Sequence, residues 1–161
     1  MNFRIGNGVD CHQLTPNKKL ILGGVLIESD LGLEGHSDGD AVIHAIVDSM
    51  LGALSLGDIG TFFPSDNKQW ENANSSIFLK FAHKKINELD FMVNNIDVTI
   101  VLQSPSLKDY VYDMRNNIAE LLDIDIDSIS VKATTTDKLG FIGERKGLVA
   151  LVTTLLVNNG N

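Results

Sequence analysis

Residues 36–60 read HSDGDAVIHAIVDSMLGALSLGDIG, a stretch in which a few polar groups interrupt an otherwise apolar helix. Apolar residues occupy nearly every side of this stretch, which predicts a helix over 40–54 that is buried on most of its faces. Ser37 stands three residues before Asp40, a spacing close to the capping box that often starts a helix. Because acidic side chains favour helix N-termini, we expect Asp38 and Asp40 in the first turn.

A polar stripe follows one side of the predicted helix. Asp40, His44 and Asp48 are spaced by four residues, and residues at this spacing share a helix face. An imidazole on a largely apolar helix needs a polar partner. His44 is therefore either a core histidine with satisfied hydrogen bonds or a functional residue, and the helix alone does not distinguish the two.

The N-terminal strand offers partners for this imidazole. Strand alternation places Phe3, Ile5, Val9 and Cys11 on one face and Arg4, Gly6, Gly8, Asp10 and His12 on the other. Asp10 and His12 thus point the same way, and with His44 they would provide three N/O ligands and leave one position open, as in catalytic zinc sites. The alternative is a surface Asp-His pair. Cys11 is expected to be a small buried residue that faces away from the metal.

Composition and charge narrow the class of protein. The 161 residues suit one domain, 1–161, with a core of its own. The net charge of -8 argues against nucleic acid as a partner, because binding a phosphate backbone requires a basic face. No apolar run is long enough for a membrane span and no signal peptide is visible, so we expect a cytoplasmic protein. One cysteine cannot form an internal disulfide, which is typical of a reducing compartment.

The remaining elements alternate between strand and helix patterns. Predicted strands are one ending near residue 12, a hairpin around Gly23 and Gly24, 95–103, 123–133 and 147–157; predicted helices are 75–90 and one that begins at 104–106. Residues 55–74 form the longest stretch without a periodic pattern, and loops of this length are usually functional or disordered. The alternation predicts an α/β (α+β) fold, a single layered domain with helices on one face of a mixed β-sheet and a small β-hairpin.

A threonine-rich segment follows the strand predicted over 123–133. Thr134, Thr135 and Thr136 could hold phosphate oxygens through hydroxyls and backbone amides, and Asp137 offers a hard oxygen ligand suited to Mg²⁺ or Mn²⁺. The alternative is a threonine-rich turn that is capped by Asp137.

Four blocks together point to a known family. RIG at 4–6 with Asp10-x-His12, GHSDGDAVIHA at 35–45, LGDIGTFFPSD at 56–66 and VKATTTDKLGFIG at 131–143 stand in family order and span nearly the whole chain. They resemble the 2-C-methyl-D-erythritol 2,4-cyclodiphosphate synthases of the non-mevalonate isoprenoid pathway. The resemblance implies a lyase that closes 4-diphosphocytidyl-2-C-methyl-D-erythritol 2-phosphate into the 2,4-cyclodiphosphate and releases CMP. It also implies a homotrimer with active sites between neighbouring subunits.

The resemblance further implies a role for individual residues. Zinc would be held by Asp10, His12 and His44, and Mg²⁺ or Mn²⁺ by Asp137. His36, Thr136 and Asp137 would be catalytic. Cytidine would lie against 102–108 and the strand end of a neighbouring subunit. The implied substrate contacts are Asp10, His12, His36, Ser37, Asp58, Ile59, Gly60, Phe63, Pro64, Ser65, Asp66, Asn67, Leu102, Gln103, Ser104, Pro105, Ser106, Leu107, Lys108, Ala133, Thr134, Thr135, Thr136, Asp137 and Phe141.

Two positions depart from the family pattern, and two other functions stay open. Asp137 stands where the family usually has Glu, and Glu144 where many bacterial members have Arg. A zinc-dependent phosphohydrolase would use the same three ligands to activate water. A metal- or isoprenoid-binding trimer without catalysis is the third hypothesis. A plastid location would require that a transit peptide had been removed.

Overall fold

The computed structural model describes residues 2–158, and its main sheet has five strands in the order β4-β1-β7-β5-β6. The strands are β1 (Asn2–Pro16), β4 (Leu31–Leu33), β5 (Met92–Val101), β6 (Ile129–Thr134) and β7 (Gly147–Asn158). β5 and β6 pair in parallel and all other neighbours pair antiparallel, so the sheet is mixed as predicted. Residues 1 and 159–161 of the predicted domain lie outside the described range.

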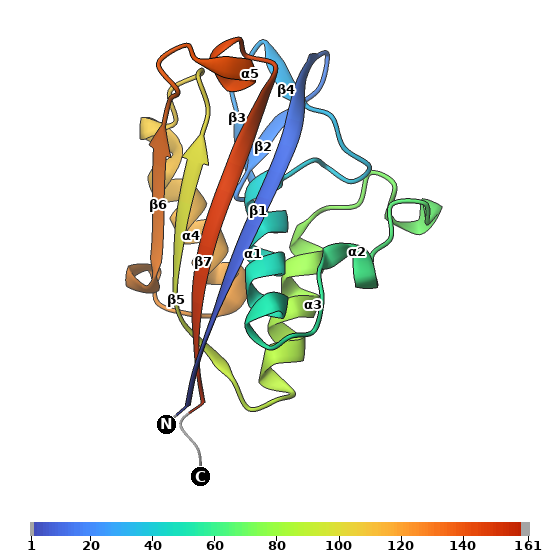
Figure 1. Ribbon diagram of the computed structural model, residues 1–161, viewed down its shortest axis with the longest axis vertical. Coiled ribbons are helices and arrows are strands. Elements are labelled where there is room, and N and C mark those ends of the chain that lie inside the picture. The colour runs from blue at the N-terminus through green and yellow to red at the C-terminus, as the bar shows by residue number, and fades with distance from the viewer. Residues whose placement is uncertain (1, 159–161) are drawn as a thin grey trace.

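Three longer helices cover one face of this sheet (Figure 1). They are α1 (Ala41–Ala53), α3 (Ser76–Asn87) and α4 (Val111–Leu122). Shorter elements are α2 (Ile59–Phe62), α5 (Gly140–Gly143) and the 3₁₀ turns η1 (Lys68–Trp70), η2 (Lys108–Tyr110) and η3 (Ile126–Ser128). A separate hairpin joins β2 (Leu20–Leu22) to β3 (Val25–Ile27). The predicted layered α/β architecture with a small hairpin is confirmed.

The central helix occupies the predicted residues, but its start differs from the prediction. Asp40 is itself the N-cap, its carboxylate accepts the backbone N–H of Ile43 at 3.0 Å, and the first turn contains no acidic residue. The capping box at Ser37 and the placement of Asp38 and Asp40 inside the helix are therefore wrong. A short aspartate accepts efficiently from the free amides of a first turn when it stands just outside the helix.

Asp40 also departs from the predicted polar stripe. The carboxylate is fully buried and accepts the backbone N–H groups of Gly23 and Gly24, at 2.9 and 2.6 Å, from the turn of the β2–β3 hairpin. Burial raises the pKa of Asp40 to about 6, although these amide donors and His44 oppose the rise. Asp40 thus joins the hairpin to the start of α1 and does not share a functional face with His44.

Two glycines set how closely α1 approaches β1. A Cβ added at Gly6 would lie 1.9 Å from the carbonyl oxygen of Ser49, and one added at Gly8 would lie 1.9 Å from that of Ala45. Only hydrogen fits in these gaps, so the alternation of glycine along β1 allows the helix backbone to rest directly on the strand. Asp10 and His12 follow on the same strand face and therefore point toward α1.

The other face of β1 lies in solvent in the single chain. Phe3, Ile5 and Val9 are 51%, 66% and 61% exposed, and Cys11 is exposed as well. The predicted alternation is correct, but the expectation that Cys11 is buried is wrong, because the helices cover only the glycine side of the sheet. β1 also continues to Pro16, beyond the end predicted near residue 12, because residues 14–16 pair with β4.

Other boundaries differ where tertiary contacts outweigh local signals. β4 was not predicted, and the loop 55–74 contains the short elements α2 and η1. The third long helix starts at Val111 rather than at 104–106, because η2 comes first, and its buried side includes Leu122. β5 begins earlier than predicted, at Met92, and the strand that ends the described chain is confirmed.

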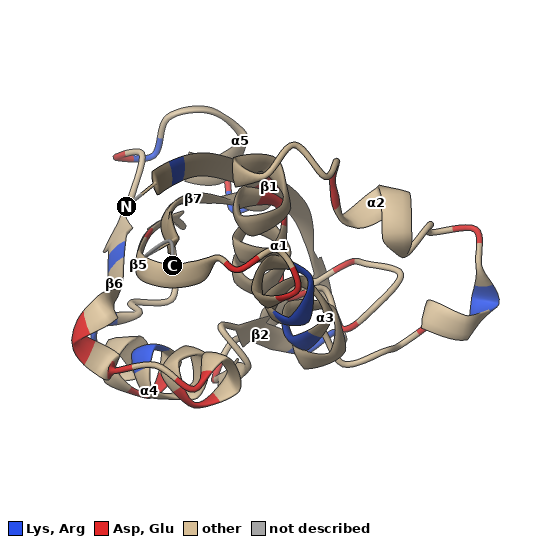
Figure 2. Cartoon of the chain, turned by 90° about the horizontal axis from the view of Figure 1, so that it is seen from below, with Lys and Arg blue, Asp and Glu red and all other residues tan. Residues whose placement is uncertain are grey.

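The acidic charge is spread over the molecule. Figure 2 shows Asp and Glu on α4 and in several loops, and basic residues gathered on α3. Arg115 is the basic residue of α4. A polyanionic ligand would therefore depend on local donors and cations rather than on the overall field. Among the described residues, no helix combines the length and the apolar composition that crossing a membrane requires.

Candidate metal centre and adjoining pockets

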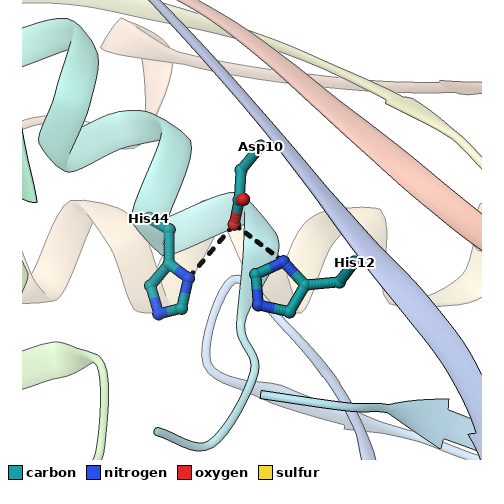
Figure 3. A group of neighbouring side chains, drawn as sticks. All are labelled: Asp10, His12 and His44. Carbon is teal, nitrogen blue, oxygen red and sulfur yellow. Dashed lines mark hydrogen bonds and ion pairs between the residues drawn. The ribbon is translucent and has the colours of Figure 1, made fainter. Parts of the chain in front are cut away.

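Asp10, His12 and His44 meet where the middle of β1 faces the first turns of α1 (Figure 3). The Oδ2 atom of Asp10 lies 3.0 Å from Nδ1 of His12 and 3.1 Å from Nδ1 of His44. One ligand atom from each of the three residues lies within 4.8 Å of the others, so the group could hold a metal ion. The strand places the first two residues and the close approach of α1 brings the third to them.

The donor set and its geometry fit a tetrahedral metal. Zinc takes nitrogen and oxygen ligands at about 2.0–2.1 Å, so neighbouring ligand atoms are about 3.3 Å apart, close to the two observed separations. Nδ1 of His12 is buried and has no hydrogen bond of acceptable geometry, although Asp10 lies within ion-pair distance. Buried nitrogen atoms normally have a hydrogen-bond partner, so a buried imidazole nitrogen without a well-aligned one fits a metal ligand. Among the described residues, this is the one group of the kind.

The three side chains also shift each other's protonation. Burial would raise the pKa of Asp10, but its close contacts with His12 and His44 and the charges of these two imidazoles lower it to about 2. Burial would lower the pKa of His44, but its hydrogen bond to Asp10 and the charges of Asp10, Asp40 and Asp38 raise it. Asp10 is thus ionised at neutral pH, and a metal that binds His44 must displace a firmly held proton.

The opposite nitrogen of His44 faces two hydroxyl groups. Its Nε2 atom lies 3.0 Å from Oγ of Ser75 and 3.1 Å from Oγ of Ser37. Ser75 in turn contacts both carboxylate oxygens of Asp38, Oδ1 through its hydroxyl at 2.5 Å and Oδ2 through its backbone N–H at 2.9 Å. The sequence marks Ser75 only as the start of the helix predicted over 75–90, so its contacts with His44 and Asp38 could be identified only in the tertiary structure.

A pocket of about 290 Å³ opens next to the three candidate ligands. Its lining includes His36, Ser37, Ile59, Gly60, Phe63 and Ser65, all of them expected near substrate, together with Trp70 and Phe78, which were not predicted. The two aromatic rings belong to a cluster in which Phe63 lies 5.0 Å from Trp70 and 4.5 Å from Phe78 between ring centroids. Phe78 lies on a helix at an apolar position typical of core packing, and Trp70 lies in a stretch without a periodic pattern. The sequence therefore contained no signal that either residue lines the pocket.

Asp58 and Asp48 hold the loop beside this pocket. Asp58 caps α2 and accepts the backbone N–H and the hydroxyl of Thr61, both at 2.8 Å, and these hydrogen bonds lower its pKa. Asp48, one turn after His44 on α1, accepts the backbone N–H of Ile59 at 2.7 Å. Asp58, Pro64, Asp66 and Asn67 are exposed and do not line the pocket, although the backbone carbonyl of Asn67 lies 3.2 Å from Nε2 of His36.

A second pocket, of about 490 Å³, lies toward the opposite edge of the sheet, where β5 and β6 end. Predicted residues that line it are Leu102, Gln103, Pro105, Ser106, Leu107, Lys108, Ala133, Thr134 and Thr135, and Val111, Val131 and Lys132 were not predicted. Ser104 lines a neighbouring hollow together with Pro105 and Arg145. The two stretches that the sequence linked to cytidine thus form one cavity, which shares no lining residue with the pocket at the metal group.

The threonine segment forms a tight turn after β6. The hydroxyl of Thr136 donates to the carbonyl oxygen of Leu139 at 2.7 Å, and the hydroxyl of Thr135 donates to Asp137 at 3.3 Å. Asp137 has a positive φ of 51° and is exposed, as is Phe141 on α5. In the single chain this segment is a hydrogen-bonded turn, and Asp137 is not part of the three-residue metal group.

The charged residues after α5 pair locally. Glu144 accepts from Lys146 at 2.5 Å, and Arg145 forms an ion pair with Asp30. The Nε atom of Arg145 is buried without a partner among the described residues. The ion pair with Asp30 links the guanidinium to the loop before β4, beside the second pocket.

Comparison with known proteins gives concordant results. The YgbB family matches residues 3–157. The 2-C-methyl-D-erythritol 2,4-cyclodiphosphate synthase of Thermosynechococcus vestitus is 49% identical over 156 residues, which cover 97% of each chain. The solved structure of IspF from Plasmodium falciparum in complex with CDP has a TM-score of 0.88 and 39% identity, and the match covers 99% of this chain and 98% of that one. Bifunctional IspDF from Campylobacter jejuni has a TM-score of 0.93 and 46% identity; the match covers 96% of this chain and 42% of that longer one.

Proposed function

Since the chain belongs to the YgbB family, as its match over residues 3–157 shows, we propose that it is a cyclodiphosphate synthase of the phosphorus–oxygen lyase type. Its substrate is 4-diphosphocytidyl-2-C-methyl-D-erythritol 2-phosphate. An oxygen of the 2-phosphate attacks the β-phosphorus, a new P–O bond closes the ring, and the bond between the β-phosphorus and the bridging oxygen breaks. CMP leaves with that oxygen, and the product is 2-C-methyl-D-erythritol 2,4-cyclodiphosphate.

No protein nucleophile is needed for this reaction, so the chain acts by positioning groups and neutralising charge. Asp10, His12 and His44 fit zinc, which when bound would supply a positive charge that polarises a phosphate oxygen. His36 and Ser37 line the same pocket and would hold the attacking phosphate or the erythritol arm. Asp58 directly precedes Ile59, which lines the pocket, and would bind erythritol hydroxyls.

The second half of the substrate would lie in the pocket at the ends of β5 and β6. Its mixed lining of aliphatic side chains, hydroxyls and Gln103 suits a pyrimidine base with its ribose. Asp137 would hold Mg²⁺ or Mn²⁺ near the diphosphate, and the backbone of the turn that contains Thr136 would bind phosphate oxygens. A complex with CDP is known for the Plasmodium falciparum relative, which supports a cytidine nucleotide here.

We further propose a homotrimer in which one 161-residue domain per subunit contributes to two active sites. The metal group lies on β1 and the second pocket at β5 and β6, with β7 between them, so the two half-sites face different edges of the sheet. Complementary patches at opposite edges join identical subunits head to tail, and such contacts form a ring when the rotation between subunits closes. The exposed apolar face with Phe3, Ile5, Val9 and Leu151, the last 41% exposed, would then be buried.

The observation that carries the proposal is that Asp10, His12 and His44 line one pocket together with several of the predicted substrate residues. Phosphorus NMR of a reaction with the cytidine substrate tests it, with and without a chelator. We expect the cyclic diphosphate and CMP to appear together, and chelation to stop both. CMP without the cyclic product would instead indicate a phosphohydrolase, and binding without consumption a non-catalytic protein.

A further inference from the structure

We propose that Ser75 is a positioning residue of the metal centre, which accepts a hydrogen bond from Nε2–H of His44 and so keeps Nδ1 as the ring nitrogen that faces Asp10 and His12 and would bind the metal. This inference rests on the metal site of the proposed function. It concerns how the protein prepares one ligand before metal or substrate arrives. Partners behind a metal-binding histidine commonly set its tautomer and ring orientation.

The direction of the Ser75 hydroxyl follows from its neighbours. Its Oγ atom lies 2.5 Å from Oδ1 of Asp38, and an ionised carboxylate can only accept. The hydroxyl hydrogen is therefore committed to Asp38, and the remaining lone pairs of Oγ face the imidazole at 3.0 Å. Ser75 is only 1% exposed, so water does not compete for these groups.

The ring nitrogen opposite must then be the donor. Since Ser75 cannot offer a second hydrogen, Nε2 of His44 carries one, and a neutral imidazole has its lone pair on the other nitrogen. That nitrogen is Nδ1, which in the metal-free chain donates to Oδ2 of Asp10 at 3.1 Å. When a metal displaces this hydrogen, the lone pair that remains on Nδ1 faces Asp10 and His12. Ser37 also lies within 3.1 Å of Nε2, but no carboxylate holds its hydrogen among the described residues, so it can donate or accept and does not select a tautomer.

A second observation sets Ser75 apart from an ordinary helix cap. It occupies the N-cap position of α3, where a serine hydroxyl usually accepts a backbone N–H of the first turn, yet it makes no such bond. Its hydroxyl is turned toward Asp38 and His44 instead. The backbone N–H of Asp38 donates to the carbonyl oxygen of Ala73 at 3.1 Å, so the same network also fixes the end of the loop beside the substrate pocket.

The test compares metal affinity in Ser75→Ala and Ser76→Ala by competition with a chromophoric chelator, using zinc alone. Ser76 is the next residue, lies on α3 and has no side-chain hydrogen bond among the described residues, so its replacement is a matched control. We expect zinc to bind about 10–100-fold more weakly to Ser75→Ala and with parental affinity to Ser76→Ala. Thermal unfolding of both metal-free variants checks that the fold is retained.

A measurement on the unmodified protein does not depend on the variants. Long-range ¹H–¹⁵N NMR of the zinc-bound chain should show His44 protonated at Nε2 and ligating through Nδ1. The opposite tautomer, or equal zinc affinities of parent and Ser75→Ala, would overturn the inference, as would a parent chain that binds no zinc. A parent that binds zinc in this tautomer but does not release CMP would refute the proposed function and leave the role of Ser75 standing.

Discussion

Replacing Gly8 with alanine should separate β1 from α1 and disrupt the metal centre from a distance. The added Cβ would lie 1.9 Å from the carbonyl oxygen of Ala45, whereas real Cβ contacts stay beyond 3.0 Å, so the backbones must part by at least 1.1 Å locally. Neither atom belongs to a flexible side chain that could move aside. Overpacking of this kind costs about 1–3 kcal/mol of the free energy of unfolding.

The same displacement reaches the metal ligands. Asp10 is two residues from Gly8 on the strand, and His44 precedes Ala45 on the helix. Metal–ligand distances tolerate changes of only about 0.2 Å, so a shift of this size should prevent simultaneous coordination by strand and helix. We therefore expect a lower stability together with a loss of zinc affinity that is larger than the stability change alone would cause.

Calorimetry and zinc competition on Gly8→Ala measure these two effects, with Gly52→Ala as the control. A Cβ at Gly52, on the exposed side of α1, meets nothing within 4 Å, so this substitution should raise stability by about 0.5 kcal/mol. For a chain of this size Tm should fall by about 2–12 °C in the first variant and rise by about 1–2 °C in the second. Equal Tm values and equal zinc affinities in the two variants would refute the close-approach argument.

Four further outcomes are expected. His44→Ala should lose bound zinc by elemental analysis while keeping its far-ultraviolet circular dichroism spectrum, because one of three ligands is removed. His36→Ala should reduce turnover in the CMP-release assay without loss of zinc, and a parallel loss of zinc would contradict its placement on substrate. Asp137→Asn should abolish Mg²⁺-dependent turnover and retain zinc, whereas Asp137→Glu should keep measurable activity. If Asp137→Asn turns over at the parental rate at low Mg²⁺, Asp137 is not a ligand of the second metal. Zinc affinity should fall as pH decreases through the pKa of His44, which its contacts with Asp10 and nearby carboxylates raise, since the metal and the proton compete for Nδ1. A zinc affinity that does not change between about pH 8 and pH 6 would show that His44 is not a ligand.

Much of the fold could be predicted because its elements carry strong local signals. The apolar run of α1, the alternation of β5 and β7 and the Gly23-Gly24 turn all specify local backbone conformation through side-chain period and turn chemistry. β4 carried no such signal, because three residues become a strand only where β1 extends to meet them. The start of α4 was misplaced for a similar reason, since Pro105 suggested a helix start that the chain reaches only after η2.

The candidate site likewise contains some residues that local sequence patterns predict and others that only the packing of the elements brings together. Asp10, His12 and His44 could be named from the sequence, because strand alternation and a polar stripe on an apolar helix are local patterns, and the order of four motifs indicated the family. Only the tertiary structure could add Ser75 and Asp38 behind His44, set Asp40 apart from the site, and show that the residues around 102–108 and 133–135 form one pocket at another edge of the sheet. The physical reason is that sequence periodicity determines the side of an element on which a residue lies, whereas the partner on that side depends on how the elements pack.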